Sequence, residues 1–76
     1  MTPIPRAAFD LLLSDIQRAI GCATMGGLIA GHDLLRQGLR RAEYARLQGE
    51  AWAPALIARY QQAISEYLLF YDRRLE

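Results

Sequence analysis

The chain has 76 residues, 53% of them hydrophobic, so it can form one small domain with more apolar surface than a lone domain of this size easily hides. Nine arginines, no lysine and eight acidic residues give a net charge of +1, which provides no general attraction to nucleic acid or acidic lipid. A single cysteine excludes an intrachain disulfide, and neither a secretory signal nor an apolar span of about 20 residues is evident, so we expect a cytoplasmic protein without a membrane span.

Between the prolines, apolar residues recur at intervals of three and four, which predicts an all-α fold without strands. The first helix is expected over about residues 3–20, with Thr2 as its cap and Pro3 in its first turn. Asp10 and Asp15 are not spaced to share one face, and both are interpreted as solvated side chains. The apolar face of this helix comprises Phe9, Leu12, Leu13, Ile16, Ala19 and Ile20.

The stretch from Ala19 to Gly31, AIGCATMGGLIAG, carries no charge and is rich in glycine. These glycines favour a break between Gly21 and Gly27, because each interior glycine costs a helix about 1 kcal/mol relative to alanine. A heptad-like apolar step nevertheless continues through the stretch, so one long helix folded back as a hairpin is the alternative. The glycine spacing is similar to that of a phosphate-binding loop, but the lysine, the hydroxyl and the preceding strand are missing, so no cofactor is expected.

The middle helix is expected over about residues 27–48, and small residues recur along one side of it at spacings of three and four. Small side chains at that spacing let a second helix approach closely. We therefore predict a helix-packing seam along this side. The seam comprises Gly27, Gly31, Leu34, Gly38, Ala42 and Ala45.

Four arginines form the strongest polar cluster of the same helix: Arg36, Arg40, Arg41 and Arg46. A guanidinium group pairs bidentately with a carboxylate or a phosphate, so the cluster is a candidate site for an acidic protein surface or for nucleic acid. A protein partner is favoured over nucleic acid, because the domain as a whole is nearly neutral. A plain solvated surface is the simplest alternative.

Gly49 is expected to end the middle helix, and Pro54 fits the first turn of a third helix over about residues 53–75. The apolar stripe of this helix is wide and rich in tyrosine, a residue that suits both cores and interfaces. One leucine falls on its polar face, which suggests a second contact surface, and two aromatic residues border the stripe. The candidate partner contacts at this end of the chain are Trp52, Leu69 and Phe70.

No catalytic or metal-binding arrangement is found in the sequence. His32 and Asp33 are neighbours, so on a helix their side chains diverge and cannot form a paired base and orienting group. Cys22 has no second thiol and is interpreted as a small buried side chain. We therefore expect no enzyme, no metal and no cofactor.

The sequence thus predicts a single helical domain over residues 1–76, built as a small three-helix bundle or a long helical hairpin. We expect a homodimer that forms through the C-terminal helix or the seam, because the apolar surface is in excess. The expected function is that of a non-enzymatic protein-binding module, such as an adaptor, small chaperone or inhibitor. The alternative is a small DNA- or RNA-binding regulator that uses the arginine cluster. The complete use of arginine in place of lysine is typical of small bacterial or phage-like proteins.

Overall fold

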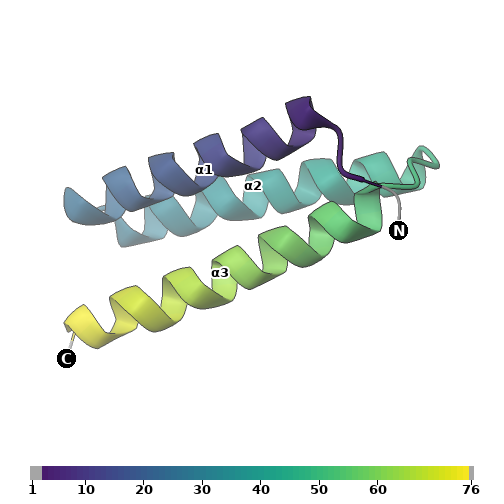
Figure 1. Cartoon of the computed structure of the whole chain (residues 1–76). Helices are drawn as coiled ribbons and strands as arrows, with labels where there is room; N and C mark the ends of the chain where they lie inside the picture. The colour runs from purple at the N-terminus through teal and green to yellow at the C-terminus, as the bar shows by residue number, and fades with distance from the viewer. Residues whose placement is uncertain (1–2, 76) are drawn as a thin grey trace.

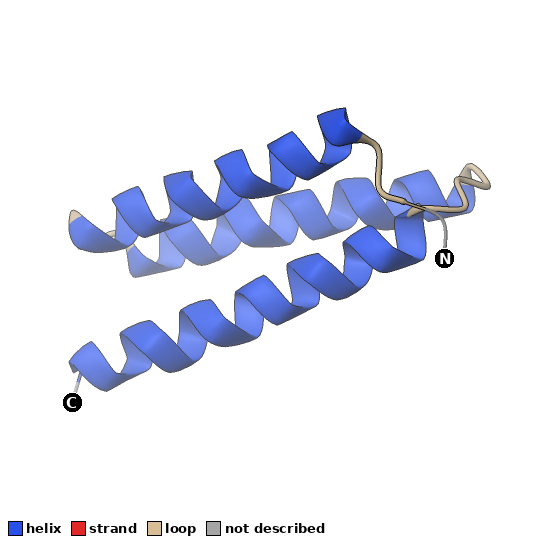
Figure 2. Cartoon of the chain, in the orientation of Figure 1, coloured by secondary structure: helices blue, strands red, loops and turns tan. Residues whose placement is uncertain are grey.

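The computed structural model describes residues 3–75, with side chains as far as Tyr71, and these residues form three packed helices and no strand (Figures 1 and 2). The helices are α1 (Arg6–Thr24), α2 (Leu28–Leu47) and α3 (Ala53–Leu75). They lie side by side in an elongated body of 41 × 17 × 17 Å. Figure 1 shows that α1 and α3 run in the same direction and that α2 runs opposite to both. No helix of this described part has the combination of length and hydropathy that crossing a bilayer requires.

The first helix starts later than predicted, at Arg6 and not at residue 3. Pro5 holds the position before the helix with ψ of 144°, and a proline disfavours the helical conformation of the residue before it, here Ile4. Pro3 therefore stands outside the helix. The predicted cap Thr2 lies outside the described residues.

The same helix also ends later than predicted, at Thr24 and not at residue 20. Gly21 stays inside it, and the turn follows at Gly26, whose φ is +86°. The amide of Gly27 donates to the carbonyl of Cys22 at 2.7 Å and that of Gly26 to the carbonyl of Ala23, which is the Schellman pattern. Residues 3–48 thus contain two helices, and the long-helix alternative is wrong.

The turn between α2 and α3 has the same hydrogen-bond pattern. Gly49 has φ of +85°, its amide donates to the carbonyl of Arg46, and the amide of Glu50 donates to the carbonyl of Ala45. The middle helix accordingly runs from residue 28 to residue 47, one residue inside its predicted bounds at each end. Both turns depend on a glycine in the left-handed region, which side chains disfavour.

The core consists of two clusters along the bundle, and α2 contributes to both. One cluster groups Ala19, Ala23, Leu35, Tyr67 and Tyr71. The other groups Leu12, Ala42, Leu56 and Tyr60. Helix α2 packs closely against both of its neighbours, whereas α1 and α3 contact each other much less. The side of the bundle between α1 and α3 is therefore its open side.

Candidate functional site

The small-residue side of α2 faces the tyrosines of α3. Gly38 lies against Tyr60, and a Cβ atom added to Gly38 would overlap the ring and stand 2.6 Å from its hydroxyl oxygen. Gly31 lies against Tyr67, where an added Cβ would overlap the hydroxyl and stand 2.7 Å from the carbonyl oxygen of Ala19. The two glycines thus provide the space in which two large aromatic side chains lie on the backbone of α2.

The other residues predicted for the seam lie at different depths. Ala42 is buried in the core, and Leu34 and Ala45 are half-buried. Gly27 is half-buried in the first turn, where its added Cβ would stand 3.1 Å from the carbonyl oxygen of Cys22. The seam is therefore an intramolecular contact between α2 and α3 at Gly31 and Gly38, and Gly27 contributes to the turn.

A hydrogen bond completes the contact at Gly31. The Tyr67 hydroxyl donates to the carbonyl oxygen of Leu28 at 3.0 Å, in the first turn of α2. The pKa of Tyr67 is raised, first by burial and then by the neighbouring Tyr71 and Cys22. Tyr67 and Tyr71 also contact each other, with ring centroids 4.7 Å apart.

A buried polar cluster links all three helices. Asp15 of α1 is only 3% exposed, and its Oδ2 atom accepts hydrogen bonds from Arg41 Nη2 of α2 at 2.6 Å and from the Tyr60 hydroxyl of α3 at 2.7 Å. Burial, the hydrogen bond to Asp15 and the charge of that carboxylate raise the pKa of Tyr60 to about 12. Although burial lowers it, the pKa of Arg41 is raised by the interactions with Tyr60 and Asp15.

The interpretation of Asp15 as a solvated residue is therefore wrong. Asp15 stands three residues after Leu12 and four before Ala19, so it lies in the middle of the buried side of its helix. A charged residue in that position needs a partner when buried, and this spacing was the signal that could have found it. Within the described part of the chain, no buried side-chain nitrogen or oxygen lacks a hydrogen-bond partner.

The predicted arginine cluster is divided by the fold. Arg41 turns toward α1 and pairs with Asp15, although its side chain is still half exposed. Arg36 and Arg40 are exposed one turn apart on α2, and Arg46 is exposed in the last turn. The structure places three of the four arginines on the surface and gives the fourth an internal partner.

The three other candidate contacts lie in different places. Trp52 is half-buried beside the cluster of Leu12 and Leu56, and its indole nitrogen donates to Glu50 Oε2 at 3.0 Å. Leu69 is 68% exposed on α3. Phe70 is 61% exposed, and its ring packs edge-on against Tyr71 with centroids 4.9 Å apart.

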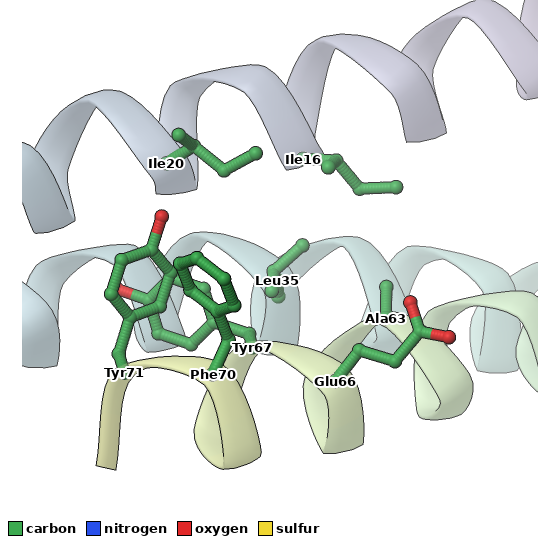
Figure 3. Close-up of a pocket in the computed structure, with 8 residues that line it drawn as sticks. All are labelled: Ile16, Ile20, Leu35, Ala63, Glu66, Tyr67, Phe70 and Tyr71. Carbon is green, nitrogen blue, oxygen red and sulfur yellow. The ribbon is translucent and has the colours of Figure 1, made fainter. Parts of the chain in front are cut away.

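An apolar groove of about 400 Å³ opens between α1 and α3, the two helices that contact each other least (Figure 3). In Figure 3, Ile16 and Ile20 come from α1 above the groove, Leu35 of α2 forms its floor, and the remaining residues come from α3. Glu66 is the one charged residue among those that line it. The α3 side consists of Ala63, Glu66, Tyr67, Phe70 and Tyr71.

The apolar side of α1 extends the groove along the bundle. Phe9 and Leu13 precede Ile16 and Ile20 at steps of four, three and four residues, which places all four on one side of the helix. Phe9 is 38% exposed, and Leu13 and Ile20 are each 44% exposed. We call the groove together with Phe9 and Leu13 the open face.

No group of three or more histidine, cysteine or acidic side chains within the described residues is placed to hold a metal ion. No protein-family model matches the chain, and neither a curated protein nor a solved structure matches it.

Proposed function

We propose that the protein is a non-enzymatic protein-binding module, such as an adaptor, small chaperone or inhibitor, and that it binds through the open face. The observation that carries this proposal is the apolar groove between α1 and α3, bordered by exposed Ile20 and Phe70. Contiguous exposed apolar side chains on a small domain are typical of protein-interaction sites.

The shape of the open face favours a helix as the bound element. The groove lies between two helices that run in the same direction, and apolar side chains continue beyond it at helical spacing on α1. An amphipathic helix binds such a groove through residues one turn apart. Helices of a partner would pack on α1 and α3 from the side opposite α2, which already packs against both.

Self-association through the same face is part of this proposal. A domain of 76 residues has a small core, and association with a further copy removes apolar surface from water. We also propose that the protein works in the cytoplasm, where its single cysteine stays reduced.

Photo-crosslinking tests the binding function. A benzoylphenylalanine residue in place of Leu13 is expected to form a covalent adduct with a protein under native conditions, and Phe70→Glu should abolish it by placing a charge in the groove. The matched control carries the same group in place of Leu69, which is exposed on α3 and does not line the groove. No adduct from position 13, or adducts of equal yield from positions 13 and 69, would overturn the proposal.

A second candidate function is binding of nucleic acid by the exposed arginines of α2. Arg36 and Arg40 are one turn apart, and neither makes an ion pair within the part of the chain that the structure describes. Two such side chains can contact successive phosphates. The pairing of Arg41 with Asp15 reduces the number of free arginines, so this function ranks below protein binding.

A further inference from the structure

We propose that the partner of the open face is a second copy of this chain, bound in antiparallel orientation about a twofold axis that crosses the face. This inference rests on the proposed function, since it names the occupant of the same surface. Three features of the open face support it: the symmetry of its α1 side, the charges of its α3 side and the common level of the two.

The α1 side of the open face can pair with itself. Phe9, Leu13, Ile16 and Ile20 follow steps of four, three and four residues, a pattern that reads the same in both directions. Its midpoint falls between residues 14 and 15. When two copies of α1 meet antiparallel at this midpoint, Phe9 meets Ile20 of the second copy and Leu13 meets Ile16. Each exposed apolar side chain then packs against another.

Two described residues give the α3 side of this surface one negative and one positive charge: Glu66, which lines the groove, and Arg59, which extends the open face beyond it. Arg59 stands two turns before Glu66, so helical spacing places it on the same side of α3, with the small Ala63 between them. Arg59 is exposed and makes no ion pair within the described residues. Glu66 is exposed and accepts a hydrogen bond from Gln62 at 3.2 Å.

Antiparallel pairing brings these two charges together twice. About a midpoint between residues 62 and 63, Arg59 of each copy faces Glu66 of the other, and the interface is isologous. In the parallel arrangement, α3 of one copy lies over α1 of the other, so the two charges face the apolar side chains of α1 without a counter-charge. Unpaired charges in an interface are costly, which favours the antiparallel arrangement.

One axis serves both helices, because the two midpoints lie at the same level of the bundle. The two midpoints are 48 residues apart in the chain. Leu12 and Tyr60 are also 48 residues apart, and they lie at one level because they belong to the same core cluster. Ile16 and Ala63, which line the same groove, are 47 residues apart. Since α1 and α3 run in the same direction with the same rise per residue, residues of α1 and α3 that are about 48 positions apart lie at the same level along the whole face.

The dimensions of the body suit a stable dimer. A face of 41 × 17 Å has a projected area of roughly 700 Å², close to the approximately 800 Å² that each partner buries in an interface of standard size. The second copy would cover the groove and the exposed side chains that border it. The exposed arginines of α2 and Leu69 would stay outside this interface, available to a further partner.

A charge-swap series tests the register, with the molar mass measured by light scattering over a concentration series. The wild-type chain is expected at twice its mass of 8.6 kDa. Arg59→Glu and Glu66→Arg should each raise the dimer dissociation constant by about tenfold or more, because each places like charges opposite each other twice. The double variant R59E/E66R restores the attractive pairs and should dimerise like the wild type. Arg36→Glu, an equal change of charge on α2, is the matched control and should leave the mass unchanged.

Mixing the two single variants distinguishes loss of dimerisation through charge repulsion in the proposed register from loss through unfolding. R59E carries two acidic groups at these positions and E66R two basic ones, so an equimolar mixture should form the heterodimer although neither variant dimerises alone. Far-ultraviolet circular dichroism of each variant confirms that its helices are formed. A mixture that stays monomeric, or a wild-type dimer indifferent to both charge reversals, would overturn the antiparallel register.

A wild-type chain that is monomeric at every concentration would overturn the second copy as occupant. The crosslinking at position 13 distinguishes this failure from failure of the binding function itself. An adduct with a different protein would retain the open face as a binding site and reject self-association. An adduct with the mass of two chains that is lost in R59E and regained in R59E/E66R supports the inference.

Discussion

The contact of Gly38 with Tyr60 allows a test of the packing between α2 and α3. In an ordinary exposed helix position, replacing glycine by alanine stabilises the helix by about 1 kcal/mol. At Gly38 the added methyl group would overlap the ring of Tyr60. That ring cannot swing away freely, because it is buried and its hydroxyl donates to Asp15 at 2.7 Å. We expect Gly38→Ala to destabilise the protein by about 1–3 kcal/mol, the usual cost of overpacking a core.

Gly21 provides the matched control for this substitution. It lies within α1, and a Cβ atom added there meets nothing within 4 Å. Gly21→Ala should therefore stabilise the fold by about 0.5–1 kcal/mol, through helix propensity alone. The same chemical change is thus expected to have opposite signs at the two positions.

Urea unfolding followed by circular dichroism, with all variants at the same protein concentration, measures both effects. In thermal unfolding of the same variants, a difference of 1 kcal/mol in the free energy of unfolding corresponds to a shift of about 4–8 °C in the midpoint for a domain of this size. If Gly38→Ala is as stable as the wild type, or more stable, the close approach of Tyr60 to α2 is refuted. If Gly21→Ala is destabilising, the reasoning from helix propensity is wrong.

Asp15→Ala should lower the free energy of unfolding by about 1–3 kcal/mol, because the buried Tyr60 hydroxyl loses its acceptor while the half-exposed Arg41 can turn to solvent, and thermal unfolding will measure this. The pKa of Tyr60 is raised to about 12, so its neutral hydroxyl stabilises the fold fully below pH 10, and this stabilisation is lost as the pH rises from 10 to 12. The free energy of unfolding should fall by on the order of 2 kcal/mol over that range. Urea titrations at each pH measure this fall, which Tyr60→Phe should reduce. Leu69→Ser should change stability by less than about 0.5 kcal/mol, because the side chain is exposed, and a larger loss would show that Leu69 is covered. The second candidate function predicts binding of duplex or single-stranded nucleic acid at about 50 mM salt that weakens steeply as salt is added. The double variant R36E/R40E should lose this binding. A flat titration of the wild-type chain would reject the nucleic-acid function.

The helices and their turns were largely predictable from local signals. Gly26 and Gly49 occupy the left-handed position of two Schellman turns, and glycine is the residue that this position favours. The end of α1 was predicted too early, because Gly21 resembles a break although the helix tolerates it. A glycine within a helix and one that ends it cannot be distinguished by residue type alone. The hydrogen bonds of the following residues decide between them.

The polar cluster could not be assembled from local signals. Asp15 bonds to Arg41 and Tyr60, which are 26 and 45 residues away in the chain, and helical spacing says nothing about side chains on other helices. The tyrosines that lie against Gly31 and Gly38 were unpredictable for the same reason, although a close contact along that side of α2 was expected. The spacing of residues indicates which side of each helix is apolar or small, and the packing of the three helices determines what covers that side.

The open face also shows the limit of periodicity. The apolar residues of α1 were assigned to one face, yet Leu12 and Ala19 are buried while Leu13 and Ile20 are nearly half exposed. A stripe of this width covers more of the helix surface than α2 and α3 can bury together. Of the eleven large hydrophobic side chains that are exposed among the described residues, four lie on the open face: Phe9, Leu13, Ile20 and Phe70.

The distribution of polar and apolar contacts in the bundle is the physical basis of the association proposed above. The buried carboxylate of Asp15 accepts hydrogen bonds from Arg41 and Tyr60, so this cluster orients the three helices. Apolar side chains are exposed at Ile20 and Phe70, on the two sides of the groove. Burial of apolar surface is the main driving force of protein association. A bundle that holds its buried carboxylate in internal hydrogen bonds and exposes apolar side chains along a groove is therefore suited to the proposed binding of a second apolar surface.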